Sequence, residues 1–163
     1  MAQAPKEIVG VPRKPLIKVV QEWEETTQLK IADEAFVELI YRNIGDLDAQ
    51  TINSFTNCTK LSLSSNFITK IPDIHLHHLE TLSLGRNKIR YIKGLEWVAG
   101  TLKNLWLSYN EIDKLDPLKP MLKLVQLYMG NNLIAKIDEL NNLVYIIFLI
   151  FLLFFLYFLD WIN

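Results

Sequence analysis

The sequence has little cysteine, no excess of charge of either sign and none of the common catalytic motifs. Its one cysteine excludes an internal disulfide and is typical of a reducing compartment. The 18 acidic and 17 basic side chains nearly cancel, so no global field attracts nucleic acid. Residues 1–15 contain no apolar stretch of the kind that forms a secretory signal. Without a phosphate-binding glycine loop, serine-hydrolase elbow or zinc-protease motif, we expect an intracellular protein that is not an enzyme.

A short pattern that recurs four times is the main positive signal. Asparagines follow one another at intervals of 21, 23 and 22 residues, each preceded by two large apolar residues and followed by an isoleucine. The four units read L-S-L-S-S-N-F-I, L-S-L-G-R-N-K-I, L-W-L-S-Y-N-E-I and L-Y-M-G-N-N-L-I, and their asparagines are Asn66, Asn87, Asn110 and Asn132. This L-x-L-x-x-N-x-I pattern is typical of leucine-rich repeats, whose period is about 20–29 residues.

Each unit is expected to begin with a short strand whose leucines point inward and whose alternate side chains point outward. The chain then turns at the asparagine, whose amide can bond backbone groups of its own and adjacent coils. Without that amide, each orphaned backbone group would cost about 1–3 kcal/mol. The remaining inward positions are predicted to be Ile68, Ile89, Ile112 and Ile134, then Ile71, Ile92, Leu115 and Ile137, and finally Cys58, Leu79, Leu102 and Leu124.

Since no single unit can bury its apolar face, the units must stack into a solenoid. We predict an α/β leucine-rich-repeat solenoid of about four to five 22-residue repeats, with a parallel sheet on the inner wall and short helical turns on the convex side. A degenerate first coil contains Val37, Leu39, Ile44 and Leu47, with Arg42 in the asparagine position. An N-terminal capping helix and an apolar C-terminal helix complete the predicted fold.

Composition divides the chain into four predicted parts. Residues 1–15 hold three prolines among basic residues and are predicted to form a disordered lead. Residues 16–36 are predicted to form the N-terminal helical cap, because apolar residues follow a helical spacing over about 16–26. The solenoid occupies 37–142, and 143–163 form an apolar tail of uncertain status.

The apolar tail contains no charge, glycine or proline between Leu143 and Leu159. Each large apolar side chain left in water forgoes about 1.5–3 kcal/mol, so such a segment needs a cover. Its length lies at the lower limit for a membrane-spanning helix, and Lys136 is the nearest preceding base. Three interpretations stay open: a membrane anchor, a buried apolar cap, or a gene-model artefact, since its residue types can be written in A and T alone.

The inner wall is the expected contact surface, because solenoids of this kind bind partners there. Alternation along the strands exposes twelve candidate partner-binding residues, counting two at the rim: Lys60, Ser62, Ser64, Thr81, Ser83, Arg86, Asn104, Trp106, Ser108, Tyr109, Gln126 and Tyr128. Trp106 and Tyr128 occupy equivalent places on neighbouring strands and should lie side by side. Such an aromatic pair bordered by small residues resembles a protein-binding hot spot, although it could also simply cover the sheet.

The cysteine and the histidine cluster have simpler explanations than catalysis or metal binding. Cys58 occupies an apolar repeat position, which indicates a core residue in place of a reactive thiol. His75, His77 and His78 have only Asp73 and Glu80 as nearby acidic neighbours and lie on a predicted convex turn. We therefore expect no metal site and no cofactor.

Beyond the generic repeat, residues 17–142 resemble the leucine-rich-repeat light chains of axonemal outer-arm dynein, the light chain 1 family. The similarity covers I-K from Ile17 with W-E-E from Trp23, the four repeat units in order, and K-G-L-E from Lys93. That family continues past the fourth asparagine into another repeat and a terminal cap with basic residues. The tail from Leu143 replaces these parts here, so no role of that cap is carried over.

The resemblance implies a non-catalytic subunit that binds the dynein heavy chain at its motor unit, on the microtubule-binding tip of the stalk, and modulates ciliary motility. The expected location is the cytoplasm and cytoskeleton, in the axoneme of a cilium or flagellum, with tubulin nearby and no nucleic-acid partner. Two alternatives stay open: a tail-anchored leucine-rich-repeat adaptor at a membrane, and a phosphatase-regulating repeat protein built on the same 22-residue unit.

Overall fold

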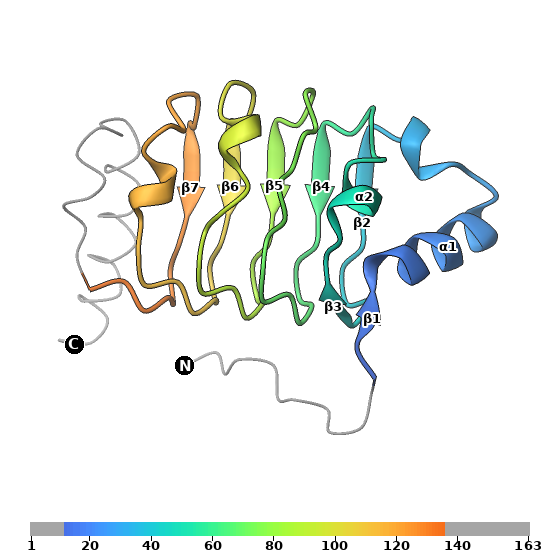
Figure 1. Cartoon of the computed structure of the whole chain (residues 1–163), viewed down its shortest axis with the longest axis horizontal. Coiled ribbons are helices and arrows are strands. Elements are labelled where there is room, and N and C mark those ends of the chain that lie inside the picture. Colours follow the sequence, from blue (N-terminus) through green and yellow to red (C-terminus); the bar gives the residue numbers. More distant parts are fainter. Residues whose placement is uncertain (1–11, 136–163) are drawn as a thin grey trace, which may run out of the picture.

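The chain folds into a row of stacked coils with one parallel sheet along its inner wall (Figure 1). The computed structural model describes residues 12–135. The sheet has five strands in sequence order, β2 (Phe36–Glu38), β4 (Lys60–Ser62), β5 (Thr81–Ser83), β6 (Asn104–Trp106) and β7 (Gln126–Tyr128). The predicted solenoid with its parallel inner wall is therefore confirmed.

The register of the sheet aligns equivalent positions of every coil. Val37, Leu61, Leu82, Leu105 and Leu127 pair in one row, and all five are buried. This row is part of one continuous core. The core also contains the second apolar residue of each strand pattern, the isoleucine that follows each asparagine, and the leucines of the convex side. Stacking thus covers the apolar face that no coil could bury alone.

The asparagines form the predicted ladder between coils. In the third of these units, the Asn110 Oδ1 accepts the Ile89 N–H at 3.0 Å, and its Nδ2 donates to the carbonyls of Leu84 and Leu107, each at 3.0 Å. Asn66 and Asn87 repeat the arrangement and are buried, whereas Asn132 makes the same three bonds while half-buried. Each amide thus satisfies backbone groups of its own coil and of the coil before it.

The residue before each ladder position adopts a left-handed backbone conformation in every coil. The φ angles lie between 56° and 60° at five non-glycine residues: Tyr41, Ser65, Arg86, Tyr109 and Asn131. This conformation costs about 1–2 kcal/mol for a residue with a side chain, so neighbouring bonds must hold it in place. These turns lie just after the C-terminal ends of the strands, so their side chains form a row along that edge of the solenoid.

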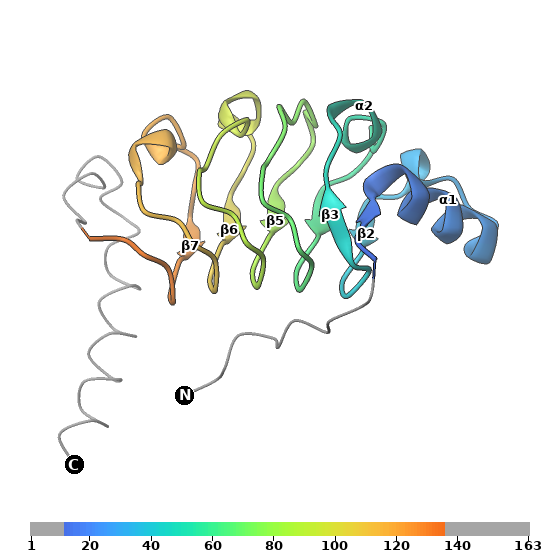
Figure 2. The same ribbon diagram turned by 60° about the horizontal axis from the view of Figure 1, so that its bottom comes forward.

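The N-terminal end of the stack is covered by helix α1 (Leu16–Thr27), which lies across the first coil (Figures 1 and 2). Leu16, Val19 and Val20 are buried, and Trp23 packs against the core at its edge. The helix ends at Gln28, whose left-handed backbone lets its N–H bond the Glu24 carbonyl. A 3₁₀ turn, η1 (Ile31–Asp33), leads into β2. Strand β2 begins at Phe36, which was predicted to be the last residue of the N-terminal cap.

A second, two-stranded parallel sheet was not predicted. It joins β1 (Lys14–Pro15) to β3 (Ile44–Asp46), and the Lys14 N–H bonds the Asn43 carbonyl at 2.8 Å. The prediction of a disordered lead over residues 1–15 is therefore wrong at its C-terminal end. Pro15 has no backbone N–H and is therefore tolerated at a sheet edge, where the Lys14 N–H donates the hydrogen bond between the two strands. Residues 1–11 lie outside the described part of the chain.

The convex arcs absorb differences in coil length. Successive strands of the main sheet begin 24, 21, 23 and 22 residues apart, and the sheet register nevertheless stays fixed. The arcs contain the short helix α2 (Ala49–Ile52) and the 3₁₀ turns η2 (Glu96–Val98) and η3 (Asp116–Leu118), while the shortest coil has none of these. The predicted helical or 3₁₀ connections are thus present.

Several predictions fall on residues 136–163, which lie outside the described part. They concern the inward position of Ile137, the solenoid boundary at 142 and the apolar C-terminal helix within 143–163. Among residues 12–135, no helix has the length and apolar character that crossing a membrane requires.

Candidate binding surface

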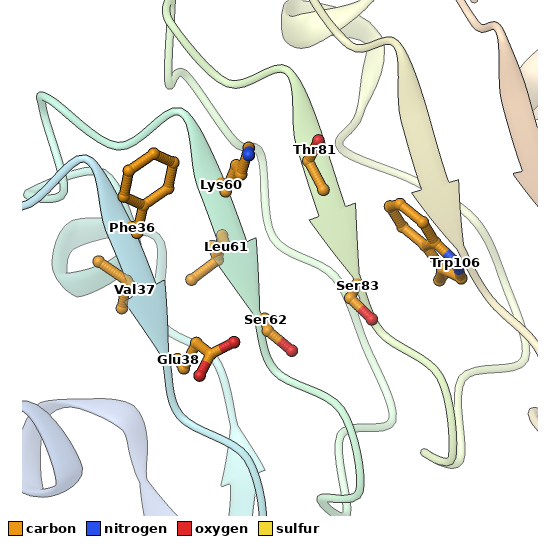
Figure 3. Close-up of a pocket in the computed structure, with 9 residues that line it drawn as sticks. All are labelled: Phe36, Val37, Glu38, Lys60, Leu61, Ser62, Thr81, Ser83 and Trp106. Carbon is orange, nitrogen blue, oxygen red and sulfur yellow. The ribbon is translucent and has the colours of Figure 1, made fainter.

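The inner wall presents two parallel rows of outward side chains, fixed by the strand register. One row runs through Phe36, Lys60, Thr81, Asn104 and Gln126, and the other through Glu38, Ser62, Ser83, Trp106 and Tyr128. Figure 3 shows the first three strands and Trp106 from this side. The structure thus brings ten side chains from five coils onto one surface, eight of which were predicted from strand alternation.

The aromatic end of the wall is a stacked pair. The Trp106 and Tyr128 rings lie 5.3 Å apart between centroids and within 7° of parallel. Both side chains are half-buried, so each keeps accessible surface. Two large, rigid side chains that hold each other in place lose little entropy when a partner covers them.

The middle of the wall is polar and internally bonded. The Ser64 and Ser83 hydroxyl oxygens lie 2.7 Å apart, and the Asn104 Nδ2 donates to the Thr81 Oγ1 at 3.1 Å. Ser62 and Ser108 add two more small side chains nearby. A partner can therefore approach the backbone of this region closely without displacing a bulky residue.

The first strand adds two residues to the wall that sequence reasoning missed. Phe36 is 61% exposed, and the Lys60 Nζ lies 4.9 Å from its ring centre. Glu38 faces the same side from the end of β2 (Figure 3). With Lys60, Ser62, Thr81, Ser83 and Trp106, these two side chains line a depression of about 380 Å³ on the inner wall. The degenerate first coil has Arg42 in place of the ladder asparagine, so only its alternating Phe-Val-Glu pattern could have indicated them.

Arg86 and Tyr109 lie at the rim, away from the centre of the wall. They occupy the left-handed position of adjacent coils, and the Arg86 guanidinium lies 4.4 Å from the Tyr109 ring centre. Stacking of this kind holds a guanidinium flat while its N–H groups stay directed outward. The two residues therefore belong to a different surface from the Trp106–Tyr128 pair.

The described residues carry no group arranged for catalysis. Cys58 is fully buried, and this burial raises the pKa of its thiol to about 11, so the thiolate that would act as a nucleophile is not formed at neutral pH. Within residues 12–135, no three His, Cys, Asp or Glu side chains gather as metal ligands. His75 instead packs against Trp97, with ring centroids 4.5 Å apart.

Comparison with protein families and curated proteins adds a second line of evidence. Residues 56–97 and 101–142, about half of the chain, match the family described as Leucine Rich repeats (2 copies). Dynein axonemal light chain 1 of Danio rerio is 42% identical over 87 residues, which cover 52% of this chain and 45% of that protein. The protein of the same name from Chlamydomonas reinhardtii is 44% identical over 66 residues, covering 40% and 33%. The chain spans about half the length of the curated relatives that it matches.

Solved structures show the same architecture. An internalin C2 from Listeria monocytogenes superposes with a TM-score of 0.63 at 25% identity, covering 71% of this chain and 50% of that one. A chain of the Drosophila melanogaster SNF/U2A′ complex gives 0.55 at 22% identity, with 68% and 69% covered. The second likeness concerns the fold alone.

Proposed function

This chain belongs to the leucine-rich-repeat family, and on that premise we propose that it is a non-catalytic light chain of axonemal outer-arm dynein. In this role the inner wall binds the motor unit of a dynein heavy chain, at the microtubule-binding tip of its stalk. The protein then works in the axoneme of a cilium or flagellum, with tubulin nearby. The similarity to light chains from a fish and from Chlamydomonas reinhardtii supports the proposal.

The stacked Trp106 and Tyr128 are the observation that carries the binding mode. Aromatic side chains can each bury about 150–250 Å² and dominate interface energetics. Here they stand beside the small residues Ser83 and Ser108 on a rigid sheet, so a partner helix or loop can cover them completely. The rest of the wall then provides shape and polar complementarity.

A bound light chain can modulate a motor without any chemistry of its own. It shifts the motor between two conformations only by the difference in its affinity for them. All coils of the solenoid pack into one core, so the inner wall keeps a fixed shape. A wall of fixed shape binds most tightly to the heavy-chain conformation whose surface matches it. The proposed modulation of ciliary motility is therefore a change in conformational populations.

Replacing both Trp106 and Tyr128 with alanine is expected to weaken heavy-chain binding by at least about tenfold, because hot-spot truncations cost about 2–4 kcal/mol. Calorimetric titration against a heavy-chain motor fragment would measure the affinity, and thermal unfolding would check the fold. The matched control is Trp97→Ala with Tyr91→Ala, since both aromatics are 60% exposed and lie outside the inner wall. Equal losses in the two double variants would place the binding site elsewhere.

The association itself is tested by extracting isolated cilia with high salt and sedimenting the extract on a gradient. Peptides of this chain are expected to co-migrate with dynein heavy chains in mass spectrometry. Retention in the detergent-soluble membrane fraction would instead favour the tail-anchored adaptor. Co-migration with a phosphatase catalytic subunit, without dynein, would favour the phosphatase-regulating alternative.

A further inference from the structure

A cluster of cations follows the edge of the solenoid where the strands end, the lower edge in Figure 1. We call this cluster the basic rim, and its members are Arg13, Arg42, Arg86 and Lys88. It is confined to the segment before β1 and the first three coils. In the fourth coil, Glu111 takes the position equivalent to Lys88. A chain with a net charge of −1 thus concentrates positive charge on one edge.

Aromatic rings lie against three of the four cations, Arg13, Arg86 and Lys88. The charged groups of Arg13 and Lys88 lie 5.6 and 5.7 Å from the centre of the Phe67 ring. One coil further on, Arg86 lies over Tyr109 at 4.4 Å. These contacts join side chains of the N-terminal segment and successive coils into one surface, because each ring attracts cations to its face.

Two of the four cations have charge available for a partner. Within residues 12–135, neither Arg42 nor Arg86 forms an ion pair, and the Arg42 side chain is exposed. A planar guanidinium can bind a carboxylate through two parallel N–H bonds. The rim is therefore prepared for anionic groups, carboxylates in particular.

The same aromatic contacts disfavour a nucleic acid as the partner. Single strands are bound largely by stacking of bases on open aromatic faces. Here two cations already lie near the Phe67 ring, and Arg86 lies over Tyr109. A polypeptide carboxylate needs no such face, since it requires only donors and positive charge.

The spacing of the rim fits an extended acidic segment. Arg42 and Arg86 belong to the first and third coils, which places their backbones about 10 Å apart at the usual separation of strands. Side chains on one side of an extended peptide repeat about every 7 Å, and glutamate side chains are long enough to adjust. A short run of acidic residues can therefore engage both arginines at once.

We propose that the basic rim binds an acidic polypeptide segment, a run of glutamates or aspartates. This surface is distinct from the inner wall and does not depend on the proposed light-chain function. The partner is defined by its chemistry: successive carboxylates in an extended chain.

The test is the binding of the full chain to a fluorescent decaglutamate peptide at low ionic strength, followed by anisotropy. The double variant Arg42→Gln with Arg86→Gln is expected to bind about tenfold more weakly, because it removes both guanidinium contacts to the peptide carboxylates. The control, Lys93→Gln with Lys123→Gln, removes the same charge from exposed positions off the rim and should change affinity less than about twofold. Thermal unfolding of both variants checks that the fold is retained.

Three results would overturn the proposal. Absence of decaglutamate binding by the unaltered chain would exclude the site. An equal loss in the control would show a general charge effect without a defined surface. Tighter binding of a ten-nucleotide oligothymidine than of the peptide would assign the rim to nucleic acid.

Discussion

Gly94→Ala is expected to destabilise the solenoid by about 2–5 kcal/mol, the sum of backbone strain and overpacking. Gly94 has a φ of +79°, and a Cβ built on it would lie 2.2 Å from the Pro72 carbonyl oxygen. The clash is with backbone, which cannot rotate away as a side chain could. Moving the loop would also break the 2.8 Å bond from the Ile74 N–H to the Gly94 carbonyl.

Gly100→Ala is the matched control, because a Cβ there meets no atom within 4 Å. Urea unfolding monitored by circular dichroism would compare both variants with the unaltered chain. We expect Gly100→Ala to stay within about 0.5 kcal/mol of it, as surface substitutions usually do. Similar midpoints for the two variants would mean that the Pro72 loop yields, contrary to the close contact at Gly94.

Asn110→Ala should be the second large effect, a loss of about 2–4 kcal/mol. The substitution removes one amide that bonds three backbone groups: the Ile89 N–H and the carbonyls of Leu84 and Leu107. Each buried group left without a partner costs about 1–3 kcal/mol, and partial relaxation of the coil lowers the sum. Hydrogen exchange of the Ile89 amide would locate the loss in this coil.

Asn132→Ala provides the comparison, since Asn132 makes equivalent bonds but is half-buried. Water can replace part of its bonding, so the expected loss is about half that of Asn110→Ala or less. If both substitutions cost the same, burial would not be what makes the ladder important. If neither lowered stability, the ladder would not support the fold at all.

The sequence predicted those parts of the fold that depend on residues within one repeat. Strand leucines, ladder asparagines and core isoleucines recur at fixed offsets, so their inward direction follows from the pattern. Residues whose roles come from distant contacts were missed. Lys14 bonds to Asn43 in another segment, and Gly94 is required because Pro72, in the preceding coil, lies against it.

The binding surface divides in the same way. Trp106 and Tyr128 stack because they share one repeat position on adjacent strands, which the sequence displays directly. The basic rim was not predicted as a surface, because Arg13 comes from the segment before the repeats, and Arg42 and Arg86 belong to coils that are not neighbours in the stack. Only the folded edge places them together.

Coil lengths between 21 and 24 residues leave the inner wall unchanged, because the convex arcs take up every difference. The part of each coil that can change in length is therefore separated from the part that meets a partner. During evolution, insertions and deletions on the outer arcs can accumulate without shifting Trp106 against Tyr128. The convex arcs of such a protein can therefore change in sequence and length while the positions of the side chains on the inner wall stay the same.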